Sequence, residues 1–282
     1  MKGVVASFRF LLSDVIGADD SAPPELPEHL PSSVVPVAGA AVDRLIDFQG
    51  PGYAQLYVDR LRRFTRRRDV GEALLFDVTG LMAQRMCYDD PIWRAQQVIG
   101  GTARQSSSGD TAVMTFRLED VLASMPAQIF QIPIVGINWA EWCHRDKPLR
   151  FDPATPSGYA RLKMLAGLQR WRPFSQRYAA ERAWVERWLH MIDRCLAKQP
   201  LAAPVVAQTA TMVQGDGDNY RQGAADWRCI IDGLVKPVCD GRLALPDLAE
   251  AVQEARAAAA ASPRDGAARA VAAIRARVAA AA

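Results

Sequence analysis

Apolar residues recur every three or four positions through much of this chain, which is the spacing of one buried face on an α-helix. Val42, Leu45 and Ile46 begin the first such run, and Gly50-Pro51-Gly52 interrupts it. The same spacing predicts further helices over residues 53–68, 71–86, 118–125, 157–168 and 175–196. It resumes at Trp227 and is expected to stop at Pro237, which lacks an N–H group.

Two alanine-rich helices are predicted at the end of the chain, with Ser262-Pro263 as the cap and first turn of the second. Other segments are irregular: residues 18–38 are rich in proline, 99–112 form a polar glycine-rich loop, and 129–139 are apolar but contain Pro133 and Gly136. Residues 113–116 predict one short strand. The expected fold is mainly α, a bundle-like multi-helix domain over residues 41–282, preceded by a helix and a proline-rich linker over 1–40.

The composition is that of an ordinary globular protein: half of the 282 residues are hydrophobic, 23% are charged and the net charge is +3. No apolar run reaches the roughly 18 residues that a membrane span requires. Residues 1–12 contain Arg9 within their apolar stretch and are followed by acidic residues rather than a cleavage site, so they predict a short helix. We therefore expect a cytoplasmic protein that has no membrane partner.

The five cysteines are widely spaced and form no CxxC pair. Structural zinc and iron–sulfur clusters usually need closely spaced thiolates. Buried free thiols are the expectation, and neither a metal site nor a disulfide scaffold is predicted.

The glycine-rich segment 212–223 has two interpretations, one catalytic and one architectural. Gly215-Asp216-Gly217 matches the start of a thiamine diphosphate–magnesium motif, but neither Asn138 nor Asn219 stands where the motif needs its second ligand. A calcium loop beginning at Asp216 would have Trp227 in place of its bidentate glutamate. Gly215, Gly217 and Gly223 are therefore expected to serve sharp turns or close backbone approaches.

Two other candidate sites have simpler explanations. His144-Arg145-Asp146 is similar to the catalytic loop of protein kinases, but Phe151 occupies the position of its asparagine. The arginines of 60–68 could bind nucleic acid, but a solvated helix end complements the helix dipole and needs no such partner. No catalytic, cofactor-binding or metal-binding residue is predicted, and no nucleic-acid partner.

Five blocks, in order, resemble the C-terminal helical region of the β subunit of indolepyruvate ferredoxin oxidoreductase. The first two blocks are Val42–Gln49 with Tyr53–Tyr57, and Arg85–Asp90. The third consists of Thr115-Phe116, Leu122 and Met125-Pro126. The fourth consists of Arg172-Pro173-Phe174, Arg177-Tyr178, Glu181 and Val185–Leu189, and the fifth is the glycine-rich segment. The resemblance implies an accessory helical domain of a thiamine-dependent 2-oxoacid oxidoreductase. It also implies that thiamine diphosphate, magnesium and iron–sulfur clusters are held by a catalytic α subunit, the expected partner, and that this chain holds no cofactor.

The resemblance also nominates candidate residues for contact with substrate or with another subunit. They are Tyr88, Asp89, Asp90, Gly215, Gly217, Asp218 and Arg221. The family carries an α/β domain before this region, whereas here only residues 1–40 precede it, with 1–12 expected as a remnant of that domain's last helix. Gln214, Asp216, Asn219 and Tyr220 replace the family's Lys, Tyr, Thr and His. These departures favour the alternative of a stand-alone helical binding protein that has lost the oxidoreductase role.

Overall fold

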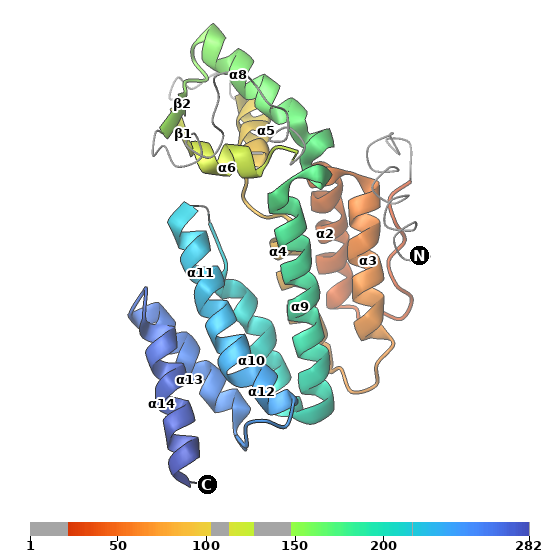
Figure 1. Ribbon diagram of the computed structural model, residues 1–282. Helices are drawn as coiled ribbons and strands as arrows, with labels where there is room; N and C mark the ends of the chain where they lie inside the picture. The colour runs from red at the N-terminus through yellow and green to blue at the C-terminus, as the bar shows by residue number, and fades with distance from the viewer. Residues whose placement is uncertain (1–21, 103–112, 127–147, 216, 282) are drawn as a thin grey trace, which may run out of the picture. The chain divides into compact units, whose positions relative to one another are not determined.

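The computed structural model describes residues 22–102, 113–126, 148–215 and 217–281 (Figure 1). These residues are mainly α-helical and include one two-stranded sheet, which confirms the predicted fold class. Contacts within the chain divide it into two compact units. Among the described residues, unit 1 consists chiefly of 46–53 and 89–182, and unit 2 of 23–45, 54–88 and 183–281.

Three helices contribute residues to both units, because the division falls within them. They are α2 (Val34–Gln49), α3 (Pro51–Thr65) and α9 (Gln176–Lys198). The other elements of unit 1 are α5 (Pro91–Thr102), β1 (Met114–Arg117), α6 (Leu118–Ala123), β2 (Pro148–Phe151), α8 (Pro156–Ala166) and the 3₁₀ segment η2 (Gly167–Phe174).

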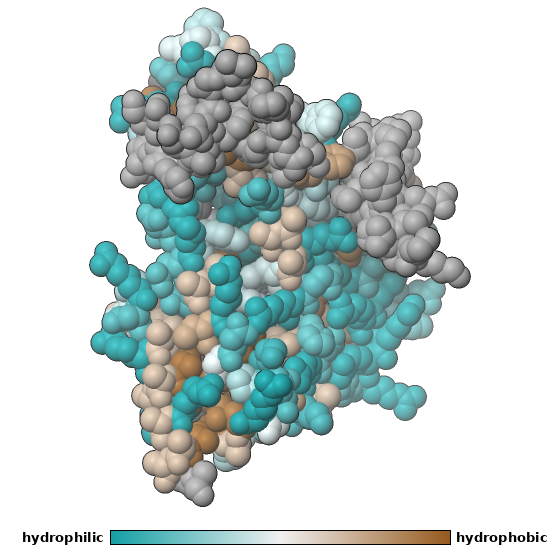
Figure 2. Space-filling view, in the orientation of Figure 1, coloured by the Kyte–Doolittle hydropathy of each residue, from teal (hydrophilic) through white to brown (hydrophobic). Residues whose placement is uncertain are grey.

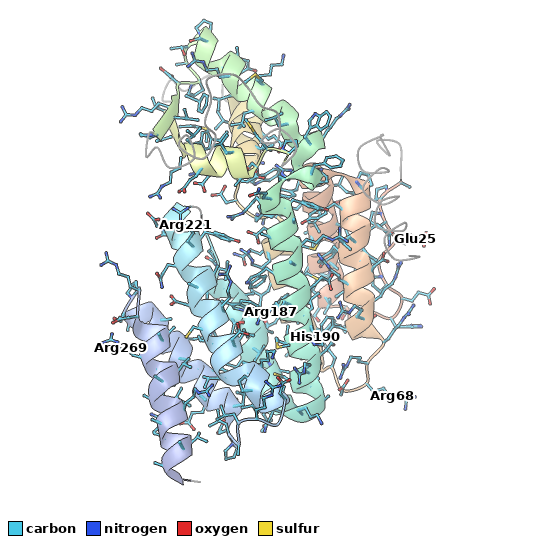
Figure 3. The ribbon with its side chains drawn as sticks, viewed as in Figure 1. Glu25, Arg68, Arg187, His190, Arg221 and Arg269 are labelled. Atoms are coloured by element: carbon cyan, nitrogen blue, oxygen red, sulfur yellow. The ribbon has the colours of Figure 1, made fainter. Side chains whose placement is uncertain are left out.

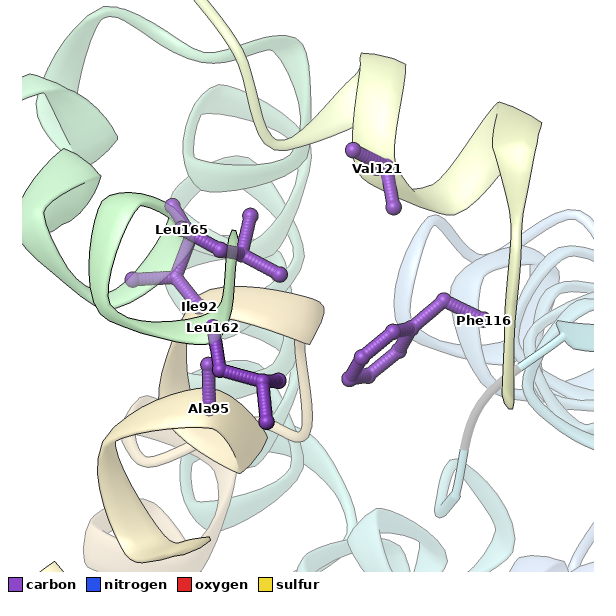
Figure 4. Packing of buried hydrophobic residues seen from close by; sticks show 6 residues of the cluster. All are labelled: Ile92, Ala95, Phe116, Val121, Leu162 and Leu165. Atoms are coloured by element: carbon purple, nitrogen blue, oxygen red, sulfur yellow. The ribbon is translucent and has the colours of Figure 1, made fainter. Parts of the chain in front are cut away.

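The sheet of unit 1 pairs β1 with β2 in antiparallel fashion, with Phe116 opposite Leu149. One face of β1 and the buried faces of α5, α6 and α8 enclose a small apolar core (Figure 4). Its buried members are Ile92, Ala95, Phe116, Val121, Leu162 and Leu165. Phe116 also lies 5.6 Å, centroid to centroid, from the ring of Phe151 on β2, so the sheet and the helices share one core.

Unit 2 continues from α3 into α4 (Glu72–Met86) and from α9 into a run of helices (Figure 1). These are η3 (Pro200–Ala202), α10 (Ala203–Gln208), η4 (Thr209–Met212), α11 (Gly217–Ile230), the π turn η5 (Ile231–Val235), α12 (Lys236–Cys239), α13 (Leu248–Ala261) and α14 (Gly266–Ala281). Asp247 caps α13, because its side chain accepts a hydrogen bond from the Glu250 amide at 2.9 Å.

The core of unit 2 is built on aromatic residues of α9 and α11. Trp188 is fully buried and donates from its indole N–H to the carbonyl oxygen of Ala207, at 3.1 Å. Trp227 is equally buried and donates to the hydroxyl of Thr209, at 3.0 Å. Each ring therefore buries a large apolar area while its one polar atom keeps a partner. The Trp188 bond holds α10 against α9, and the Trp227 bond holds the start of η4 against α11.

Helix α2 begins earlier than predicted. It starts at Val34 and contains Pro36, which the sequence analysis assigned to a loop. Proline is tolerated in the first turn of a helix because the N–H it lacks would have no partner there. Helix α5 was also missed, and it includes Gly100-Gly101 from the predicted loop.

Two helix boundaries near the C-terminus also differ from the prediction. The helical path continues past Pro237 to Cys239. The π turn Ile231–Val235 ends two residues before this proline and shifts the hydrogen-bonding pattern, so that Pro237 lies in the first turn of α12, where a proline is tolerated. Helix α14 begins at Gly266 rather than beside Ser262-Pro263. Arg264 has φ of 99°, which no right-handed helix can contain, so the helix starts only beyond it.

Several predicted features lie outside the described residues. They are the helix at 1–12, the loop over 103–112, the irregular segment 129–139, Asn138, Cys143, the 144–146 motif and Asp216.

Candidate functional site

The Tyr88-Asp89-Asp90 segment connects α4 to α5. Asp90 precedes Pro91, the first residue of α5, and its carboxylate accepts a hydrogen bond from the Trp93 amide at 2.6 Å. This is the geometry of a helix N-cap followed by a first-turn proline. Tyr88 and Asp90 are each 2% exposed, whereas Asp89 is half-buried and lies 3.7 Å from the guanidinium of Arg94.

Asp90 also forms a buried ion pair with Arg172 of η2. The Arg172 Nε donates to Oδ2 of Asp90 at 2.8 Å and Nη2 donates to Oδ1 at 3.2 Å, with both side chains almost fully buried. The same guanidinium donates to the Gln49 side chain at 2.9 Å and to the backbone carbonyl of Phe48 at 2.5 Å. It also lies 4.1 Å from the centre of the Phe48 ring.

Arg172 therefore connects two helix ends in unit 1. The carbonyls of the last turn of a helix lack partners within it, and a cation there complements the helix dipole. The N-terminus favours an anion for the same reason, and Asp90 supplies it. With Gln169, which also donates to the Phe48 carbonyl at 3.0 Å, Arg172 joins the end of α2 to the start of α5. Asp90 is engaged in this structural pair.

The glycine-rich segment lies in unit 2, between η4 and α11, and its glycines behave as predicted. Gly215 and Gly217 have φ of 76° and 54°, in the left-handed region that favours glycine. A Cβ on Gly223 would collide with the carbonyl oxygen of Met212 and lie 3.1 Å from its carbonyl carbon. Turns and close approach therefore explain all three glycines without cofactor chemistry.

Asp218 and Arg221 stand on the first turns of α11, where Arg221 is labelled in Figure 3. Their side chains are exposed and pair with each other at 2.8 Å. An exposed pair of this kind contributes about 0.5 kcal/mol or less. Asp218 and Arg221 are thus accessible to a partner, unlike Asp90.

The segment 212–213 is attached to the core of unit 2 by Arg85 of α4. This side chain is 5% exposed and donates a hydrogen bond to the carbonyl oxygen of Val213. Its guanidinium lies 4.7 Å from the ring centre of Trp184, which in turn lies 4.7 Å from the ring of Trp227. The path of the glycine-rich segment is therefore determined by one arginine and by close packing at Gly223.

A cavity of about 480 Å³ adjoins this segment in unit 2. Its polar lining consists of Thr211, Asp226, Gln253 and Arg256. Met212, Gly223 and three alanines of α13 complete the lining. Arg256 is half-buried and donates to the Thr211 hydroxyl at 3.3 Å, while its Nε is buried without a hydrogen-bond partner among the described residues. Burial lowers the pKa of Arg256, but an arginine remains charged at neutral pH.

Among the described residues, this cavity is a candidate binding site for a small anion. A partly desolvated guanidinium beside a hydroxyl and an amide can bind a small carboxylate or phosphate. Asp226 accepts a hydrogen bond from Gln222 at 2.9 Å. Gln253 and Arg256 were not among the predicted site residues, because α13 also carries Glu250 and Glu254 and its sequence does not show which of these side chains face a cavity.

A second hollow of about 830 Å³ lies between the 244–247 turn and helices α13 and α14. Leu245, Ile274 and Val278 supply its apolar lining, and Figure 2 shows apolar side chains gathered around α14. The exposed edge of this hollow carries the ion pair between Arg277 and Glu254.

The arginine run of α3 is largely neutralised by carboxylates in unit 2. Arg60, which is 3% exposed, pairs with Glu186 at 2.8 Å, and Arg63 pairs with Glu186 and Asp193, each at 3.0 Å. The expectation of a fully solvated helix end is therefore wrong for Arg60, because α9 covers it. Cys87, Cys195 and Cys239 are buried free thiols, as predicted, whereas Cys229 is a free thiol that is only half-buried.

The described residues contain no cluster of three side chains able to hold a metal ion, and none of their helices is long and apolar enough to cross a membrane. They form a mainly α-helical protein of two units, each joined internally by a buried arginine. Residues 34–233 match the model of DUF6537, a family of unknown function, and the chain belongs to this family. No curated protein and no solved structure matches the chain.

Proposed function

We propose that this chain is a helical accessory domain of a thiamine-dependent 2-oxoacid oxidoreductase complex of the indolepyruvate type. The chain would position or stabilise a catalytic α subunit that holds thiamine diphosphate, magnesium and iron–sulfur clusters. That subunit would decarboxylate the oxoacid oxidatively and pass electrons to a low-potential acceptor, and the complex would be cytoplasmic.

The proposal is supported by direct contacts between the blocks that resemble the family. In unit 1, Phe48 and Gln49 of the first block, Asp90 of the second and Arg172 of the fourth form one buried hydrogen-bonded network. In unit 2, Arg85 of the second block contacts Val213 of the last block, and also Trp184, which lies between Glu181 and Val185 of the fourth. Several residues of the resembling blocks thus join the helices, which supports a shared helical framework with an architectural role.

The test is a pull-down of the tagged protein from extract of its own cells, followed by mass spectrometry. We expect a subunit with thiamine and iron–sulfur motifs to be recovered, and an unrelated helical protein with the same tag is the control. A second bait carrying Asp218→Lys and Arg221→Glu reverses the two exposed charges on the first turns of α11 while allowing them to pair. Failure of the wild-type bait to recover such a subunit, from extract shown to contain one, would refute the proposal.

The cavity beside the glycine-rich segment favours a second candidate, a stand-alone helical binding protein for a small carboxylate. Its half-buried Arg256 supplies the cation that such a ligand needs. Calorimetric titration with indolepyruvate and phenylpyruvate would measure the affinity. Arg256→Gln should weaken binding at least tenfold, whereas Arg277→Gln, on an exposed pair outside the cavity, should leave it unchanged. Equal affinities of all three proteins would exclude this cavity as the site.

A further inference from the structure

Two buried cysteines of unit 2 lie against each other although they are 44 residues apart in sequence. Cys195 lies on α9, near its C-terminal end, and Cys239 is the last residue of α12. Their sulfur atoms are 3.9 Å apart and share a hydrogen bond. Cys195 is completely buried and Cys239 is 5% exposed, so Cys239 is the nearer of the two to solvent.

The surroundings give the two thiols different roles. The hydrogen bond from Cys195 lowers the pKa of Cys239 to about 7; burial opposes this shift, Arg194 and Lys198 favour it, and Asp240 opposes it. The same hydrogen bond raises the pKa of Cys195, and burial raises it further. A thiolate is the nucleophilic form of cysteine. Cys239 is therefore suited to react first, and Cys195 remains a thiol beside it.

Charged side chains hold the C-terminal end of α12 next to α9. Asp240, directly after Cys239, pairs with Arg194 of α9 at 2.6 Å and with Lys236 of α12 at 3.2 Å. Arg194 precedes Cys195 in the chain, so this ion pair and the sulfur contact lie side by side. A disulfide requires about 2.05 Å between its two sulfur atoms. Because the ion pair holds α12 next to α9, a change of side-chain rotamer is sufficient to bring the sulfur atoms from 3.9 Å to that distance.

We propose that Cys195 and Cys239 are a redox-active dithiol pair, which a peroxide oxidises to a disulfide linking α9 to α12. In the first step the Cys239 thiolate attacks hydrogen peroxide; the O–O bond breaks, and a sulfenic acid and hydroxide form. In the second, the Cys195 sulfur attacks the sulfenic sulfur, the S–O bond breaks and its oxygen leaves as water. Overall, two thiols lose two electrons and two protons, and one peroxide becomes two water molecules.

The other described cysteines serve as internal comparisons. Cys229 is half-buried, and burial raises its pKa, with Asp226 and Asp232 adding to the rise. Cys87 is buried, and its sulfur lies 3.9 Å from the carbonyl oxygen of Arg44. The Cys195–Cys239 pair differs from both in combining a neighbouring thiol with a thiolate-favouring environment.

The test treats the full, reduced chain with one equivalent of hydrogen peroxide, blocks remaining thiols with iodoacetamide under denaturing conditions, and maps peptides without reduction. We expect a Cys195–Cys239 linked peptide that dithiothreitol abolishes. Cys229→Ser should form the same link to the same extent. Cys195→Ser should abolish it and leave a sulfenic acid on Cys239, which dimedone would trap.

The disulfide-linked peptides of the wild-type chain test the proposal by themselves, so a variant that fails to fold does not prevent the test. Circular dichroism before and after oxidation shows whether the helices stay folded. If the folded chain instead links Cys239 to a second copy, or oxidises Cys143 or Cys229 while the pair remains alkylatable, the proposal is overturned.

Discussion

Each unit contains a buried arginine that lies over an aromatic ring and donates a hydrogen bond to the backbone of a distant segment. In unit 1, Arg172 lies over Phe48 and donates to its carbonyl oxygen. In unit 2, Arg85 lies over Trp184 and donates to the carbonyl oxygen of Val213. We call each of these arginines, with the groups it binds, a joint. The joint in unit 1 also includes the Asp90 carboxylate, whereas Arg85 in unit 2 donates its hydrogen bond to the backbone of the glycine-rich segment.

This difference determines how each joint can be broken. A carboxylate is removed by substituting one side chain, so the joint in unit 1 is sensitive at Asp90 as well as at Arg172. A backbone carbonyl survives every substitution of Val213. The joint in unit 2 is therefore sensitive at Arg85 and at Gly223, whose packing determines where the 212–213 backbone lies.

The largest effect is expected for Asp90→Ala, which leaves the Arg172 guanidinium buried without its counter-charge and removes the cap of α5. Breaking a buried pair in this way costs about 4 kcal/mol of unfolding free energy. Urea denaturation followed by circular dichroism measures it. The double variant with Arg172→Met should lose less than the sum of the two single variants; simple additivity would contradict an energetic coupling between Asp90 and Arg172.

Gly223→Ala is expected to cost about 3 kcal/mol, because its methyl group meets the Met212 backbone and not a flexible side chain. Gly215→Ala is the matched control: its methyl group would meet only the Asn219 Cβ, at an ordinary contact distance of 3.9 Å, so the strain of a positive φ remains, which costs about 1 kcal/mol. The same denaturation experiment compares them. Equal losses would mean that close approach at Gly223 is not what constrains the segment.

Arg85→Met should cost about 2 kcal/mol, since it removes a charge-assisted hydrogen bond and the contact with the Trp184 ring. Tryptophan fluorescence should change as well, because Trp184 lies under the guanidinium. Arg85→Lys keeps the charge but not the planar group, so an intermediate loss is expected. A loss for Arg85→Met as large as that for Asp90→Ala would remove the distinction between the two joints.

The smallest effect concerns Glu186, which pairs with Arg60 and Arg63 at the surface of unit 2. Burial raises its pKa, but the two arginines outweigh burial and hold the pKa below the ordinary value of 4.5. Its stabilisation is therefore present at neutral pH and is lost as the pH falls through the folded-state pKa.

At neutral pH, Glu186→Gln should reduce the unfolding free energy by about 1 kcal/mol or less, because the carboxylate is half-exposed. The difference from wild type should shrink as the pH falls below 4.5, and also in 1 M salt. A difference that is independent of pH would assign the effect to packing rather than to charge.

The apolar spacing alone was sufficient to predict α3, α4 and α9, because the period of a helix is a local property that neighbouring residues determine together. The role of the glycines in the 212–223 segment could also be predicted from the sequence. A positive φ or a close backbone approach excludes a Cβ, so a glycine indicates one or the other before the neighbouring segment is known. Helix α5 was missed because Gly100-Gly101 at its end resembles a loop. Strand β2 was missed as well: none of its four residues is fully buried, unlike Phe116 in β1.

Tertiary structure alone decided which distant residues meet. Arg172 falls between the predicted helices 157–168 and 175–196, yet folding places it against Asp90, 82 residues earlier. The same holds for Arg256 beside Thr211 and for Cys195 beside Cys239. The chain determines by itself where its helices form and turn. Only packing, which removes buried charges from water and so requires them to find partners, selects the pairs that define each candidate site.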